Sequence, residues 1–155
     1  MILTENARLR LRTMRCGDLE ELYALLSDAE VMRWLEPPFT REQAERFLQQ
    51  AGLSDPPLIY AAENAEGEFL GYVIYHDYDD HSRELGWVLR QSAWRKGYAD
   101  EMTALLTVLA RREGKDAVIE CTPEQTVSAH IARRHGFSYK GSANGLDIYR
   151  RQSTE

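Results

Sequence analysis

The sequence predicts a mixed α/β (α+β) domain that combines a mostly antiparallel sheet with one βαβ crossover. Two strand-like runs, Leu58–Glu63 and Glu68–Tyr75, are joined by a short polar turn, which is typical of a β-hairpin. A third run, Glu84–Leu89, precedes a long helical pattern and then the compact apolar run Ala117–Cys121, which is the order of a βαβ unit. The 155 residues fit a single domain, so we expect residues 1–155 to form one unit.

The N-terminal part of the chain predicts one strand and two helices. Arg8–Arg12 alternates arginine and leucine, which is the period of a half-buried strand. Asp18 with Glu21, and Thr40 with Gln43, have the spacing of capping boxes at helix starts. Apolar residues follow each cap at helical spacing: Leu19, Leu22, Tyr23 and Leu26, then Ala44, Phe47, Leu48 and Ala51.

The C-terminal part predicts two more helices. Gly97 to about Arg112 has the period of one long helix, with Gly114 as its stop. Thr122-Pro123-Glu124-Gln125 offers an N-cap, a proline at the first helical position and a capping-box glutamine, and this helix should end near His135. Two strands and the turn between them close the chain: Phe137–Lys140, Asn144-Gly145 and Leu146–Arg150.

Charge and hydropathy exclude several classes of function. The formal net charge of -6 argues against nucleic-acid binding, which needs a basic face, and suits a cationic partner such as an amine. No apolar run approaches the roughly 20 residues that span a bilayer. Met1–Arg12 lacks the apolar core of a signal peptide, so we expect a cytoplasmic protein with no membrane partner. Cys16 and Cys121 have no CxxC spacing and are expected to be reduced thiols.

The segment from His76 to His81 is rich in residue types that bind metals. It shows no strict ligand spacing, so we expect a polar tip between two strands and no metal site. The alternative that its three aspartates attract a cationic acceptor stays open.

The passage from Glu84 to Met102 carries the strongest chemical signal, because a strand runs through a short loop into a helix. The first backbone N–H groups of a helix have no internal partner and lie at the positive end of its dipole. Small residues at Gly97 and Ala99 would let an anion approach this backbone closely, and a diphosphate suits it best. Taken alone, the pattern favours an ordinary strand-to-helix turn, since G-x-G-x-x-G is absent.

In its context, this loop resembles the pyrophosphate-binding motif Gln/Arg-x-x-Gly-x-Gly/Ala of the GNAT N-acetyltransferases. The loop reads Trp94-Arg95-Lys96-Gly97-Tyr98-Ala99. This form is similar to the loop found in the ribosomal-protein N-acetyltransferase (RimJ/RimL-like) branch of the family. Further segments resemble that branch in the expected order: Ala7–Arg12, Glu30–Leu35, Glu84–Trp87, Pro123–Ser128 and Arg133–Phe137.

The resemblance implies the GNAT fold, a twisted sheet of six to seven strands flanked by about four helices. It implies an N-acetyltransferase (an acyltransferase) that uses acetyl-CoA as co-substrate and needs no metal. The acceptor would be a primary amine, either a protein N-terminal α-amine or a small molecule, and the protein would be a monomer or a homodimer.

The resemblance also implies roles for single residues. Backbone N–H groups would hold the pyrophosphate of coenzyme A at Arg95, Lys96, Gly97, Tyr98, Ala99 and Asp100. Trp87, Val88 and Leu89 would pair with the pantetheine arm like an added strand, and a strand N–H would polarise the thioester carbonyl. Gln125 and Ser128 would lie beside the pantetheine and the thiol end, and Ser128 is also a candidate catalytic residue.

The amine must lose a proton, and Glu84 is the candidate general base, since it begins the strand next to the thioester. A solvated glutamate at a strand end is the alternative.

Two departures from the family pattern keep other readings open. Gln125 stands where Asn is usual, and its amide could equally cap Thr122. Ala132 stands where many relatives have a tyrosine acid, so the leaving thiolate would need another proton source. The alternative function is therefore an acyl-CoA-binding regulatory or docking module with little or no turnover.

Overall fold

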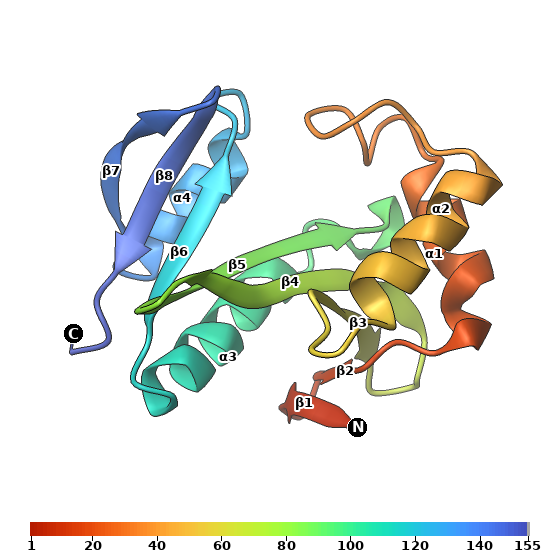
Figure 1. The fold of residues 1–155 in the computed structure, drawn as a ribbon, viewed down its shortest axis with the longest axis horizontal. Coiled ribbons are helices and arrows are strands. Elements are labelled where there is room, and N and C mark those ends of the chain that lie inside the picture. Colours follow the sequence, from red (N-terminus) through yellow and green to blue (C-terminus); the bar gives the residue numbers. More distant parts are fainter. Residues whose placement is uncertain (155) are drawn as a thin grey trace.

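The computed structural model describes residues 1–154, and all of its strands belong to one eight-stranded sheet (Figure 1). The strands are β1 (Ile2–Glu5), β2 (Leu9–Arg12), β3 (Ile59–Asn64), β4 (Phe69–Asp79), β5 (Ser82–Leu89), β6 (Asp116–Cys121), β7 (Ser138–Ala143) and β8 (Leu146–Arg151). The helices are α1 (Leu19–Leu26), α2 (Arg41–Phe47), α3 (Tyr98–Arg112) and α4 (Thr126–Arg134). Short helical turns lie at η1 (Cys16–Asp18), η2 (Leu48–Gly52) and η3 (Gln91–Ala93).

The sheet is mixed and mostly antiparallel, as the sequence predicted. Its strand order is β1-β2-β3-β4-β5-β6-β8-β7, and β5 with β6 is the parallel pair among them. One strand more than the six to seven expected is present, because Ile2–Glu5 pairs with β2 at the edge of the sheet. This strand was missed because four residues, half-buried at best, give too short a pattern to recognise.

The parallel pair β5 and β6 separates soon after it begins. Ser82–Glu84 lies in register with Asp116–Val118, and no pairing of the two strands is found beyond this point in the described part of the chain. Figure 1 shows the two strands diverging from this junction. The β6-facing edge of Leu85–Leu89 is therefore left without a neighbouring strand, while the other edge pairs with β4 along its length.

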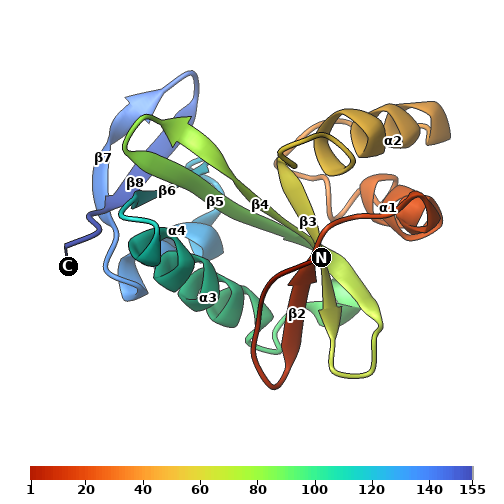
Figure 2. The ribbon, with the colours of Figure 1, turned by 60° about the horizontal axis from the view of Figure 1, so that its bottom comes forward.

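Helices cover both faces of the sheet, as Figures 1 and 2 show. On one face, α3 and α4 pack on a core that includes Leu85, Met102, Leu106 and Ile119. On the other face, α1 and α2 pack on a second core: Leu22, Leu25, Leu26, Ala44, Leu48 and Val88. No helix within residues 1–154 combines the length and the apolar character that crossing a membrane requires.

Of the three predicted capping boxes, only the one at Thr40 forms as expected. The Thr40 hydroxyl accepts from the Gln43 N–H at 3.2 Å, and the Gln43 side chain accepts from the Thr40 N–H at 2.8 Å. The box from Asp18 to Glu21 is wrong. Asp18 makes no side-chain cap of α1, because its carboxylate is bound by Arg12 and by the backbone N–H of Arg15.

The start of α4 also differs from the prediction. The helix begins at Thr126 rather than at Pro123, because Gln125 has a ψ of 65°, outside the helical range. The Gln125 side chain still accepts from the Thr122 N–H at 2.8 Å, as half of a capping box would. The bond closes a turn before the helix instead of its first turn.

Candidate active site

The loop that enters α3 has the backbone geometry of an open helix start. Gly97 is the N-cap residue with φ 81°, and Arg95 has φ 62°, so two left-handed residues turn the chain into the helix. A glycine N-cap offers no side chain to the first N–H groups, and no side-chain cap is found there. Arg95, Lys96 and Gly97 are exposed, so these donors can reach an anion from solvent.

The carboxylates in the first turn of α3 are both paired with cations. Asp100 accepts from Arg134 at 2.9 Å and lies 3.0 Å from the His135 ring. Glu101 pairs with Arg8 at 2.5 Å. The negative charge beside the open N–H groups is thus balanced by side chains from the end of α4 and from the turn before β2.

The arginines at the end of α4 contact the protein itself. Arg134 binds Asp100, and the Arg133 guanidinium lies 5.4 Å from the ring centre of Tyr149. Both arginines therefore have partners within the protein.

The predicted pantetheine strand lies directly before this loop. Val88 and Leu89 are buried and Trp87 is half-buried, at the part of β5 that has left β6. The Trp94 indole donates to the Leu89 carbonyl at 2.8 Å, so this carbonyl already has a partner within the protein. Added-strand pairing is therefore open to the remaining backbone groups of Trp87 and Val88.

Glu84 lies at the point where β5 and β6 separate, and its side chain is 22% exposed. It faces His76 across the β4–β5 pair, with 3.8 Å between the His76 Nε2 and a carboxylate oxygen. Burial raises the pKa of Glu84, and the nearby Glu120 raises this pKa further, while His76 lowers it. This environment differs from that of a solvated strand-end glutamate.

Glu120 and Tyr78 complete this cluster, and sequence reasoning missed both. Glu120 lies two residues after Val118, which pairs with Glu84, so Glu120 and Glu84 share one face of the sheet. The Tyr78 hydroxyl donates to Glu120 at 3.1 Å, and burial together with this bond raises the pKa of Tyr78. Strand alternation alone could have placed Glu120 on a face, but only the register of β5 with β6 brings it beside Glu84.

At the N-cap of α4, the structure favours the local role of Gln125. Its side-chain oxygen is engaged by the Thr122 N–H at 2.8 Å and by the Thr122 hydroxyl at 3.3 Å. Ser128 is half-buried on the same helix, and its catalytic role stays a prediction. Ala132 is fully buried in the core, so this position supplies no proton to a leaving group.

The polar segment between β4 and β5 is more regular than expected. β4 continues to Asp79, so only residues 80 and 81 form the tip, because the segment pairs with β5. Asp77 pairs with Arg83 at 2.8 Å and Asp79 with Arg150 at 3.2 Å, so these charges are balanced internally. Within residues 1–154, no cluster of three or more histidine, cysteine or acidic side chains is arranged to hold a metal ion.

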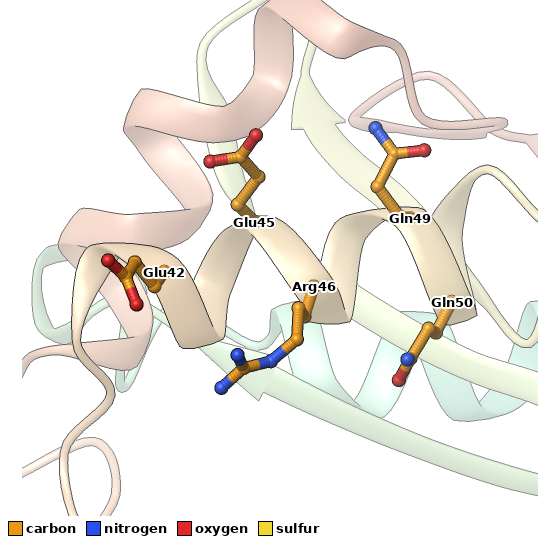
Figure 3. A pocket seen from close by; sticks show the side chains of 5 residues that line it. All are labelled: Glu42, Glu45, Arg46, Gln49 and Gln50. Carbon is orange, nitrogen blue, oxygen red and sulfur yellow. The ribbon is translucent and has the colours of Figure 1, made fainter.

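A hollow of about 370 Å³ lies elsewhere, on the outer face of α2 and η2 (Figure 3). It is lined by Glu42, Glu45, Arg46, Gln49 and Gln50. None of these residues belongs to β5, to the loop before α3 or to α4, so the hollow is separate from the candidate site.

Comparison with known protein families shows to which family this chain belongs. A model of the acetyltransferase (GNAT) domain matches residues 8–138. The chain belongs to the GNAT acetyltransferase family. It is therefore an N-acetyltransferase that uses acetyl-CoA, and the matched range contains every predicted site residue from Glu84 to Ser128.

Individual relatives of this GNAT protein agree with the assignment. An uncharacterized N-acetyltransferase of Bacillus subtilis, YnaD, is 25% identical over 138 residues, which cover 86% of this chain and 81% of that protein. A GNAT acetyltransferase from Bacillus anthracis superposes with a TM-score of 0.88 at 23% identity over 100% of both chains. The ribosomal L7/L12 α-N-protein acetyltransferase RimL, solved with coenzyme A, gives 0.82 at 21% identity over 98% of each chain. The two structural likenesses confirm the predicted GNAT fold.

Proposed function

We propose that this GNAT enzyme acetylates a primary amine at the junction of β5 and β6, with Glu84 as general base. The observation that carries the proposal is the position of Glu84, half-buried where the two strands separate and beside a second carboxylate. A raised pKa brings a carboxylate closer to neutrality and makes it a better proton acceptor near physiological pH.

The residues present fit acetyl-CoA as co-substrate. The diphosphate would accept from the open N–H groups of residues 95–100, and the pantetheine would lie along the free edge of β5. In this arrangement the thioester would lie beyond Trp87, toward Glu84 near the start of the strand.

The transfer requires the acceptor nitrogen to lose two protons. Glu84 accepts the first proton from the ammonium, directly or through a water molecule, and later releases it to solvent. The amine nitrogen then attacks the thioester carbonyl, the C–N bond forms, and the C–S bond breaks. A thiol has a pKa of about 8.5, so the thiolate leaves readily, and it takes up the second nitrogen proton through water, since the buried Ala132 supplies none.

The acceptor is proposed to arrive as a cation. Glu84 and Glu120 put two carboxylates on one face of the sheet, and Tyr78 fixes Glu120 by a hydrogen bond. Such a pair attracts an ammonium group before it is deprotonated. A protein N-terminal α-amine, as in the relative that acts on ribosomal L7/L12, and a small-molecule amine both meet this requirement.

The test is to replace Glu84 by Gln and to measure acetyl-CoA affinity and amine acetylation separately. We expect turnover to fall about 10²-fold or more, since general-base catalysis is lost, while the Kd of acetyl-CoA stays unchanged. Gly97→Val should instead raise the Kd of acetyl-CoA, because a β-branched residue is strained at φ 81°.

Glu66→Gln, in the exposed turn between β3 and β4, is the matched control and should leave both quantities unchanged. Unaltered turnover of the Glu84→Gln enzyme across the pH range would exclude Glu84 as the base. No product with any amine in a broad panel would contradict the transfer reaction itself.

A further inference from the structure

The turn between β1 and β2 lies against the loop that enters α3, although the two are about 90 residues apart in the chain. The Asn6 side chain fixes this turn by accepting from the N–H groups of Arg8 at 2.9 Å and of Leu9 at 2.8 Å. The Arg8 guanidinium then lies over the Tyr98 ring, 4.5 Å from its centre. Arg8, to which no role in the coenzyme site has been assigned so far, is thus held at the proposed diphosphate site.

Arg8 makes two polar contacts with this site. Its Nη2 donates to the Lys96 carbonyl at 2.8 Å, and its Nη1 pairs with Glu101 at 2.5 Å. The Asn6 amide donates to the other Glu101 oxygen at 3.3 Å. A Cβ on Gly97 would lie 3.8 Å from the same Nη1, which shows how closely the guanidinium approaches the glycine.

The bond to the Lys96 carbonyl orients the following peptide group. In a trans peptide the C=O and N–H bonds point in opposite directions. Holding the Lys96 carbonyl toward Arg8 therefore directs the Gly97 N–H away from Arg8. This N–H is one of the donors that the proposed function assigns to the diphosphate.

The ion pair between Arg8 and Glu101 also sets the charge beside the start of α3. A carboxylate in the first turn stabilises α3 through the helix dipole, but it also repels an anion bound at the helix start. Asp100 is balanced by Arg134 and also lies 3.0 Å from the His135 ring. Arg8 is the cation that balances Glu101, so its loss would leave an uncompensated negative charge beside the diphosphate.

We propose that Arg8 is a positioning residue of the coenzyme site, which neutralises Glu101 and orients the peptide between Lys96 and Gly97. The proposal rests on the proposed function, because it takes the loop before α3 to be the diphosphate site. It adds a residue of the β1–β2 turn to the coenzyme-site residues that the resemblance implied, which lie on β5, in the loop before α3, in the first turn of α3 and around the start of α4.

Acetyl-CoA titration by calorimetry tests the proposal with wild type, Arg8→Ala, Arg8→Lys, Glu101→Gln and the double variant Arg8→Ala/Glu101→Gln. At 50 mM NaCl, Arg8→Ala should raise the Kd about tenfold, and Arg8→Lys less, since it keeps the charge. Removing the unpaired carboxylate in the double variant should restore most of the affinity. At 500 mM NaCl the defect of Arg8→Ala should shrink, because salt screens exposed charges.

Arg10→Ala is the matched control, because Arg10 is exposed on β2 and pairs with Glu5 rather than with the loop. Its Kd should equal that of wild type, and circular dichroism should show all variants folded. An unchanged Kd for Arg8→Ala overturns the proposal. So does a loss that Glu101→Gln does not relieve and salt does not reduce, since this indicates a merely structural role. If wild type itself fails to bind acetyl-CoA, the proposed coenzyme site is wrong and the inference falls with it.

Discussion

Glu84 shows how a single side chain acquires a function from its neighbours. In the sequence it is one acidic residue among 25. In the fold it is mostly removed from water, with His76 on one side and Glu120 near it on the adjacent strand. Burial and the second carboxylate raise the pKa of Glu84 and disfavour its ionised form, while the neighbouring His76 lowers this pKa. The pH at which Glu84 can act as a base is therefore set by residues of three strands.

Two substitutions should move the acid side of the pH profile in opposite directions. Glu120→Gln removes a negative charge that raises the pKa of Glu84, so the rise of kcat/KM should shift to lower pH. His76→Gln removes a group that lowers this pKa, so the rise should shift to higher pH. Kinetics from pH 5 to pH 9 with saturating acetyl-CoA measures both. Shifts of the same sign would show that another group controls the profile.

The surroundings of Cys121, by contrast, remove a chemical role that this residue type can have. It could have been an acyl-accepting thiol, but it is 3% exposed and lies in the core between the sheet and α4. Burial raises the pKa of its thiol, which lowers the fraction of reactive thiolate. The acetyl group is therefore proposed to pass directly to the amine.

At the scale of elements, the close contact of β4 with β5 positions the part of β5 that would pair with the pantetheine. Gly71 has φ 149°, and a Cβ there would lie only 2.0 Å from the Val88 carbonyl oxygen. Any side chain at this position must push β5 aside. The glycine thus lets β5 approach β4 just where its other edge is left free by β6.

Gly71→Ala should be strongly destabilising, by about 2 kcal/mol or more, because the contact is with backbone that cannot rotate away. Urea denaturation measures the loss, and acetyl-CoA affinity should fall with the displaced strand. Gly17→Ala is the control, since nothing lies within 4 Å of its added Cβ and its φ is not in the left-handed region. Equal stability of the two variants would show that β5 can move without cost.

At the scale of the whole molecule, a buried ion network joins the start of α1 to strands β2 and β3 of the sheet. Arg12 on β2 donates to both oxygens of Asp18, each at 2.9 Å, and to Glu63 on β3 at 2.9 Å. All three side chains are 10% exposed. The network connects the start of α1 to two strands, so it fixes how the α1–α2 layer enters the fold.

Arg12→Met should lower the free energy of unfolding by about 3–5 kcal/mol, because two buried carboxylates lose their partner. Arg10→Met, on the same strand, should cost less than about 1 kcal/mol, because this guanidinium is exposed and lies 3.7 Å from Glu63, farther than Arg12 does. Thermal and urea denaturation at pH 7 compares them. A loss for Arg12→Met no larger than that for Arg10→Met would mean that water reaches the network and screens it.

The sequence by itself determined much of this protein. Hydrophobic period, capping signals and turn glycines located α3, the β3–β4 hairpin, β6 and the β7–β8 hairpin to within a few residues, because these are local properties of the chain. The motif around Gly97 indicated the family, since it depends on a backbone conformation that few residues permit. The edge strand β1 was missed because its pattern is short. The start of α4 was misplaced because the capping-box spacing from Thr122 to Gln125 closes a turn before the helix.

Only the tertiary structure decided which side chains meet. Glu120 lies beside Glu84 through the register of a parallel strand pair, and Arg8 reaches Lys96 and Glu101 across about 90 residues of chain. Asp18 left its expected cap for the same reason, because Arg12 offered its carboxylate two buried charge-assisted bonds. Local sequence sets the elements, while long-range packing sets the dielectric and the charges around each group. The chemistry of the site depends on this dielectric and on these charges, and therefore on long-range packing.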